Sequence, residues 1–209
     1  YGSDGSPLRG TRPVAARTEP LQSMRLNIPT RGKRRDAPDR RPRVCGCARV
    51  KRQEVVPCVN RPEWSGEAPA EEFRTSDGKL ERGDTTVHAG YDDSSLYILW
   101  RCLNPRPPDG SEPRPWLLDH GVVMLDPGHT HRDVSAVLVN CLGETWSPAL
   151  DCSMISCETR HRGKRWSAFL RIPFRVLGVE DAPQKGAWWG VNFVRVCPGT
   201  SDGPARWTR

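Results

Sequence analysis

The sequence predicts an all-β protein, an antiparallel β-sandwich of jelly-roll type, preceded by a disordered basic segment. Several short apolar runs alternate with polar residues at the period of a β-strand, and Gly, Pro or Asp bounds each run. No amphipathic stretch is long enough to indicate a helix of several turns. Residues 1–52 carry 14 Lys/Arg against 4 Asp/Glu, whereas the rest carry 18 against 21, so the basic charge belongs to the front of the chain.

Two regions of different composition follow from this asymmetry. We assign residues 1–47 to a disordered linker or tail rich in Arg, Pro and Gly, and residues 48–209 to the sandwich. The Arg cluster "RGKRRDAPDRRPR" would suit nucleic acid or another anionic surface, but no aromatic side chain is interleaved to stack on bases. We therefore interpret it as a solvated linker and expect no nucleic-acid partner.

The first two strands form a predicted hairpin. Thr85–Tyr91 and Leu96–Cys102 alternate, and the turn residues "DDSS" join them. The second strand is expected to divide its side chains between two faces. One face carries Leu96, Ile98, Trp100 and Cys102, and the other carries Tyr97, Leu99 and Arg101.

Four further strands are expected along the rest of the chain. Their sequences are "HGVVMLD", "VSAVLVNC", "KRWSAFLRIPF" and "AWWGVNFVRVC", and "FRVLGV" could form one helical turn after Pro173. Short strands with turns between them, and without intervening helices, indicate an antiparallel sandwich rather than an α/β sheet.

Catalysis is not supported by any motif, because the chain has no G-x-S-x-G, no H-E-x-x-H and no phosphate-binding glycine loop. Asp92 and Asp93 read as turn residues, with bound calcium as the alternative. His129, His131 and Asp133 lie close in sequence and could chelate a metal, but histidines in such loops are usually solvent-exposed. We expect neither a catalytic nor a metal site and no cofactor, with a structural calcium ion left open.

Eight cysteines are many for a reduced cytosolic domain of this size. They indicate disulfides in an exported protein or buried free thiols, and the Cys45/Cys47 and Cys152/Cys157 spacings fit zinc sites poorly. No apolar run of 18 residues is present, so the sequence predicts no membrane span and shows no signal peptide.

The tryptophans are more informative. Several fall within predicted strands and are expected in the core: Trp100, Trp166 and one of the adjacent pair Trp188 and Trp189. Trp116 and Trp207 instead lie in polar loops rich in Pro and Gly. An indole in such a loop either closes a core or offers its face to a ligand, and sugar rings suit the second role.

The order of these pieces resembles family 9 carbohydrate-binding modules over residues 50–209. The pieces are "TTVHAGYDDSSLYILWRCLNP", "PWLLDHGVVMLDPG", "AVLVNCLGETW", "RWSAFLRIPFRVLG", "GAWWGVNFVRV" and "SDGPARW". The resemblance implies a non-catalytic β-sandwich in an exported protein, appended to polysaccharide-degrading enzymes and so beside neighbouring domains. It also implies a polysaccharide or oligosaccharide partner of glucan or xylan type. By position, Trp116 and Trp207 would clamp a terminal sugar, with Asp119 fixing the strand start beneath Trp116.

Three positions depart from the family pattern. Val122 stands where a carboxylate is typical, Leu138 where an arginine binds sugar, and Phe169 where W-x-A-E-x-x-I-P has its glutamate. Stacking without polar partners gives weak, unselective binding.

Two other functions remain open. A structural sandwich packed on neighbouring domains would bury Trp116 and Trp207. A haem-binding relative of the fold would need ligands, for which Met124 and His120 are the candidates.

Overall fold

The computed structural model describes residues 43–51, 68–81, 84–103, 117–198 and 204–207. They belong to one compact unit spanning residues 41–209. The predicted disordered segment lies outside the described residues up to residue 42. The sandwich was expected to begin at residue 48, but Gly46 N already donates to Ala68 O at 3.1 Å. The folded unit thus includes residues that the sequence assigned to the linker.

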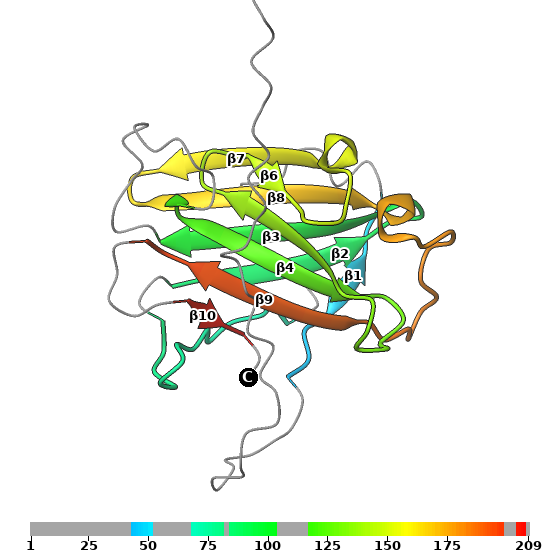
Figure 1. Ribbon diagram of the computed structural model, residues 1–209, viewed down its shortest axis with the longest axis horizontal. Coiled ribbons are helices and arrows are strands. Elements are labelled where there is room, and N and C mark those ends of the chain that lie inside the picture. The colour runs from blue at the N-terminus through cyan, green and yellow to red at the C-terminus, as the bar shows by residue number, and fades with distance from the viewer. Residues whose placement is uncertain (1–42, 52–67, 82–83, 104–116, 199–203, 208–209) are drawn as a thin grey trace, which may run out of the picture. The chain divides into compact units, whose positions relative to one another are not determined.

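The described strands form two five-stranded sheets (Figure 1). The first sheet runs in the order β1 (Cys47–Arg49), β2 (Thr86–Tyr91), β3 (Ser95–Leu103), β8 (Arg165–Pro173) and β7 (Ser156–Arg162). The second runs in the order β10 (Ala205–Arg206), β9 (Gly190–Val196), β4 (His120–Asp126), β5 (Ser135–Asn140) and β6 (Thr145–Trp146). Two 3-10 turns, η3 (Cys152–Met154) and η4 (Phe174–Leu177), lie between strands. The predicted sandwich is confirmed.

One pairing differs from the antiparallel expectation. β1 pairs with β2 in parallel, through Cys47 opposite Ala89, whereas the other strand pairs of the described residues are antiparallel. A parallel neighbour needs a long connection rather than a hairpin, and more than thirty residues separate these two strands. None of the helices in the described part is long and apolar enough to cross a membrane.

The β2–β3 hairpin forms where the sequence predicted it. Asp92 Oδ1 accepts the backbone N–H of Ser94 at 2.7 Å and of Ser95 at 2.9 Å, and its Oδ2 accepts the Tyr97 hydroxyl at 2.6 Å. The carboxylate therefore holds the turn, as side-chain acceptors commonly do in tight turns. The turn interpretation of Asp92 is confirmed.

The core lies between the two sheets, and β3 divides its side chains as predicted. Leu96, Ile98 and Trp100 belong to the central apolar cluster, whereas Tyr97 and Leu99 form a separate small cluster with Phe169. These two groups lie on opposite faces of the first sheet, because successive strand residues alternate.

Trp100 sets the spacing of the two sheets at the centre of the core. Its side chain is fully buried, and a methyl group at Gly121 of β4 would lie 2.8 Å from its ring. Only glycine fits there, because a Cβ atom at that distance would overlap the indole.

Candidate functional site

Trp207 follows β10 and is buried, with 3% of its surface exposed. Its backbone N–H donates to Phe193 O at 2.9 Å, and the two ring centroids lie 5.7 Å apart. The indole therefore belongs to the central apolar cluster and closes it beside β9. Trp116, the second predicted wall of the clamp, lies outside the described residues.

Arg43 covers the Trp207 ring. Its guanidinium carbon lies 5.5 Å from the ring centroid, a cation–π distance. The same group donates to Trp207 O at 2.8 Å, to Glu71 O at 2.8 Å and to Glu72 O at 3.0 Å. Arg43 thus ties the chain before β1 to the C-terminal strand and covers one face of the indole.

Asp119 lies at the start of β4, and its carboxylate faces the interior. Arg195 Nε donates to Asp119 Oδ1 at 2.6 Å, and Arg195 Nη2 pairs with Oδ2. Trp166 Nε1 donates to Asp119 Oδ2 at 2.8 Å. Asp119 therefore fixes the strand start, but its oxygens are held inside the sandwich at 5% exposure and do not face solvent.

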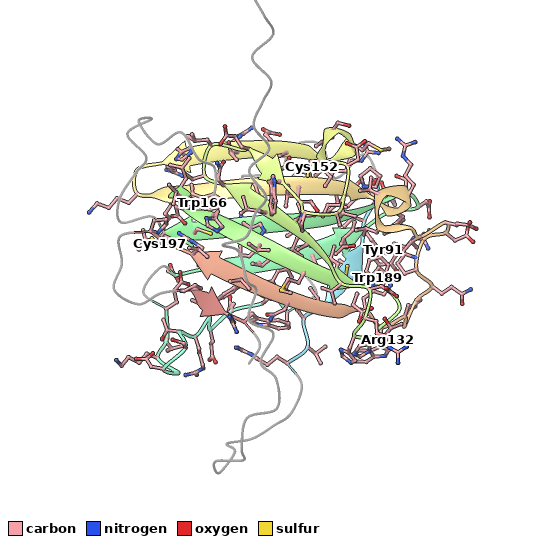
Figure 2. All side chains as sticks on the ribbon, viewed as in Figure 1. Tyr91, Arg132, Cys152, Trp166, Trp189 and Cys197 are labelled. Atoms are coloured by element: carbon pink, nitrogen blue, oxygen red, sulfur yellow. The ribbon has the colours of Figure 1, made fainter. Side chains whose placement is uncertain are left out.

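Arg195 links the two sheets through the same cluster. From β9 it donates to Thr85 Oγ1 at 3.1 Å and to Leu103 O at 3.2 Å, both on the first sheet's side. Burial alone would lower the pKa of Arg195, but the facing Cys102 and Asp119 raise it, so the guanidinium stays charged. Its carbon also lies 5.3 Å from the Trp166 ring centroid. Figure 2 shows Trp166 at the end of the strands where Cys197 lies.

Two of the three departures from the family pattern meet on one surface. Val122 and Leu138 are direct cross-strand partners of β4 and β5. They point away from the core, because the neighbouring Gly121 and Val123 point into it. Here both positions are apolar and buried.

These residues belong to a continuous row across the second sheet. Its members, paired in register from one edge to the other, are Arg206, Val194, Val122, Leu138 and Trp146. The row has a half-buried indole at one edge and an exposed guanidinium at the other. The sequence did not indicate that Trp146 lies on this face, because its strand has only two residues and shows no alternation.

Phe169 does not share this surface. It belongs to β8 of the first sheet and stacks on Tyr97, with ring centroids 5.7 Å apart and an angle of 20°. Its side chain therefore packs against an aromatic neighbour on the outward face of the other sheet. The three departures thus lie on two different faces.

The residues considered as metal ligands and those considered as haem ligands lie in different parts of the structure. His129 and His131 have positive φ angles of 49° and 59°, and their rings lie 4.9 Å apart in an exposed loop. Among the described residues, no group of three or more His, Cys, Asp or Glu side chains could hold a metal ion. His120 and Met124 both lie on the outward face of β4, and His120 Nδ1 contacts Leu118 O at 2.7 Å. Burial lowers the pKa of His120.

The adjacent tryptophans point in different directions, as predicted. Trp189 packs against the core, with its ring centroid 5.9 Å from that of Phe174, whereas Trp188 is 68% exposed. Trp189 also lines an open pocket of about 440 Å³ at the end of β4. The sequence predicted that one indole of this pair packs in the core, without assigning which, and gave no indication of the pocket.

The comparisons with known proteins give structural matches only. No family model and no curated protein matches the chain. A family 9 carbohydrate-binding module from Caldicellulosiruptor kristjanssonii, in complex with cellotriose, aligns with a TM-score of 0.52 at 17% identity, over 66% of this chain and 72% of that one. The module's complex with glucose aligns with a TM-score of 0.52 at 16% identity, over 66% and 74%.

A third solved structure agrees with these two. It is a proposed carbohydrate-binding protein from Bacteroides uniformis, with a TM-score of 0.50 at 12% identity, over 66% of this chain and 75% of that one. Identities this low establish likeness of fold alone. The described domain therefore has the β-sandwich fold of family 9 carbohydrate-binding modules, as the resemblance in sequence implied.

Proposed function

We propose that the sandwich is a non-catalytic carbohydrate-binding module, and that it serves as an accessory domain of an exported carbohydrate-active protein. The observation that supports this most is the shared fold with a module solved in complex with cellotriose and with glucose. A glucan- or xylan-type polysaccharide is the ligand class in this proposal.

Trp116 and Trp207 are the stacking residues of the proposal. For Trp207 to stack on a sugar, Arg43 must leave the ring, because the indole is 3% exposed with the guanidinium in place. A guanidinium plane and a sugar ring both pack on an indole face, so the two would compete for one position. The proposal therefore includes Arg43 as a competitor that weakens binding.

Affinity electrophoresis in soluble glucan and in xylan tests the assignment. W116A and W207A should each abolish retardation of the full chain, whereas R43A should increase it. R49A is the matched control, since Arg49 is an exposed arginine of the same segment that pairs with Asp93. Because Trp207 is a core residue, each variant's thermal unfolding is measured beside its binding. Unchanged retardation of both tryptophan variants would contradict the clamp.

A structural role is the second candidate, and the burial of Trp207 and Asp119 favours it. In that case the sandwich packs on neighbouring domains of a longer protein, and Arg43 and Trp207 serve as a permanent closure of the core. R43A would then lower the melting temperature without producing any retardation by glucan or xylan.

A further inference from the structure

The pocket at the end of β4 is a second candidate binding site, separate from the Trp207 ring. It has a volume of about 440 Å³ and lies between the loop after β4 and the segment that joins η4 to β9. Pockets for small ligands occupy about 300–1,000 Å³. Figure 2 shows Trp189 and Arg132 at the end of the strands opposite Trp166 and Cys197.

One wall of the pocket is an oriented indole. Trp189 is half-buried, and its ring packs on Phe174 of η4 in an edge-on arrangement at 69°. Because that contact fixes the ring, the part of the indole that lines the pocket is held ready for a ligand. Pro127, Pro183 and Val179 complete an apolar surface around it. Such a wall suits the C–H face of a sugar ring.

Two carboxylates, those of Asp126 and Asp133, are among the polar groups of the lining. Asp126 lines the pocket, and its oxygens accept the backbone N–H of Thr130 at 3.0 Å and of His131 at 2.6 Å. Asp126 is only 4% exposed, so its carboxylate acts on a ligand through its charge, and the exposed Thr130 and Asp133 are the polar residues of the lining that a ligand reaches. Burial alone would raise the pKa of Asp126, but these N–H groups lower it below its usual range. The carboxylate is therefore ionised at neutral pH.

Gly190 keeps this carboxylate in place. It is the cross-strand partner of Asp126, and a Cβ atom there would lie 3.0 Å from Asp126 Cβ and 3.4 Å from its Oδ2. A side chain at this position would push the carboxylate out of its site. Trp189 therefore directly precedes the glycine that leaves room for the Asp126 side chain.

The lining selects the charge of a ligand. Asp126 and Asp133 line the pocket, Thr130 is a further polar residue, and the described lining residues include neither Lys nor Arg. Such a surface accepts hydrogen bonds from hydroxyl or ammonium groups and repels carboxylates. We propose that this pocket, the Trp189 pocket, binds one pyranose ring that carries no negative charge. The choice of a sugar as ligand rests on the proposed function, whereas the charge preference rests on the lining alone.

Three pyranoses that differ in charge test the proposal with the full ¹⁵N-labelled chain. Methyl β-glucoside, glucosamine and glucuronate are titrated at about pH 6.5, where the amine is protonated. We expect saturable shifts of the Trp189 indole N–H and of the Thr130 and His131 amides with the first two sugars. Glucosamine should bind about fivefold or more tightly than the glucoside at low salt, and glucuronate should not saturate.

Matched variants separate the pocket from its surroundings. W189A should weaken glucosamine binding about tenfold or more, whereas W188A, which removes the neighbouring exposed indole, should not change it. D133N should reduce the preference for glucosamine, and D181N, at an exposed carboxylate outside the lining, should not. D133N leaves the packing of the core intact, so the proposal does not depend on W189A folding normally.

The NMR signals of Trp189 and Trp207 report the pocket and the proposed clamp separately. The experiment therefore distinguishes failure of the pocket proposal from failure of the proposed function. Shifts at Trp207 without shifts at Trp189 would support the proposed function and overturn the pocket. Equal binding of glucuronate and glucosamine at Trp189 would overturn the charge preference. Absence of saturation with all three sugars, or binding of Ca²⁺ alone at Asp126 and Asp133, would overturn the pocket as a sugar site.

Discussion

At the scale of residues, a buried cluster of polar side chains joins the two sheets. Asp119 directly precedes β4, whereas Arg195 lies on β9 and Trp166 on β8 of the other sheet, and every oxygen of the carboxylate has a donor. A buried ion pair of this kind adds little when complete, but breaking it leaves an uncompensated charge in the core.

R195M should therefore destabilise the domain by about 3–5 kcal/mol in urea unfolding, because Asp119 would remain buried without its partner. R165M is the control, since Arg165 pairs with Asp84 on the surface and both side chains are more than 60% exposed. Its loss should cost about 0–1 kcal/mol. Similar costs for the two variants would contradict the structural role of the cluster.

G121A tests the contact that spaces the sheets. The added methyl group would lie 2.8 Å from the Trp100 ring, so the indole or the strand must move. We expect a loss of about 1–3 kcal/mol by urea unfolding. Combining it with W100F, which removes part of the indole, should recover some of that loss, whereas strictly additive losses would argue against a direct clash.

At the scale of elements, the β2–β3 hairpin depends on one acid. Burial alone would raise the pKa of Asp92, but hydrogen bonds from Tyr97, Ser94 and Ser95 lower it below its usual value. A carboxyl group with a lowered folded pKa stabilises the fold above its unfolded pKa, about 3.9, and this contribution is lost as the pH falls through the folded pKa.

D92A should cost about 1–3 kcal/mol at pH 7, because it removes the carboxylate that accepts hydrogen bonds from the Tyr97 hydroxyl and from the backbone N–H groups of Ser94 and Ser95. The difference from the unaltered chain should shrink as the pH falls below about 4 in urea-unfolding series. D93A is the control, since Asp93 is exposed and pairs only with an exposed Arg49 in the described residues. A D92A cost that stays constant down to pH 2 would contradict this account.

The sequence was a good guide to elements that have one apolar face. The hairpin strands, β4, β5, β8 and β9 were all anticipated, because alternation is the signature of a half-buried strand. β7 was missed, since none of its seven residues is buried and "SCETRHR" has no apolar face. β1, β6 and β10 have two or three residues, too few to show any period.

The candidate site was harder to predict than the fold. Trp207 and Asp119 were predicted as sugar-site residues, and both are buried among partners that lie far away in the sequence. Arg43 is 164 positions from Trp207, and Arg195 is 76 positions from Asp119. Neither spacing leaves a pattern in the sequence, because only the folded topology brings such residues together.

At the scale of the whole molecule, the open question about the cysteines is whether they are buried free thiols or disulfides. Burial raises the pKa of four thiols that lie against the apolar core. These are Cys45 at about 11, Cys102 at about 12, Cys141 at about 11 and Cys157 at about 12. The thiolate is the reactive form, so these groups should be almost inert at neutral pH.

Titration with Ellman's reagent at pH 8 should show these four thiols reacting slowly in the native chain and rapidly after unfolding in guanidinium. Mass spectrometry of the alkylated peptides identifies each one. Rapid reaction of Cys102 in the native state would contradict its burial, and no reaction even after unfolding would mean that these cysteines are disulfide-bonded.

The proposal that this sandwich binds a glucan- or xylan-type chain rests on its fold. Isothermal titration of the full chain with cellotriose tests it most directly, with R43A titrated in parallel. We predict a saturable heat of binding for the unaltered chain and tighter binding for R43A. No heat from either protein, with both folded by circular dichroism, would contradict carbohydrate binding at Trp207.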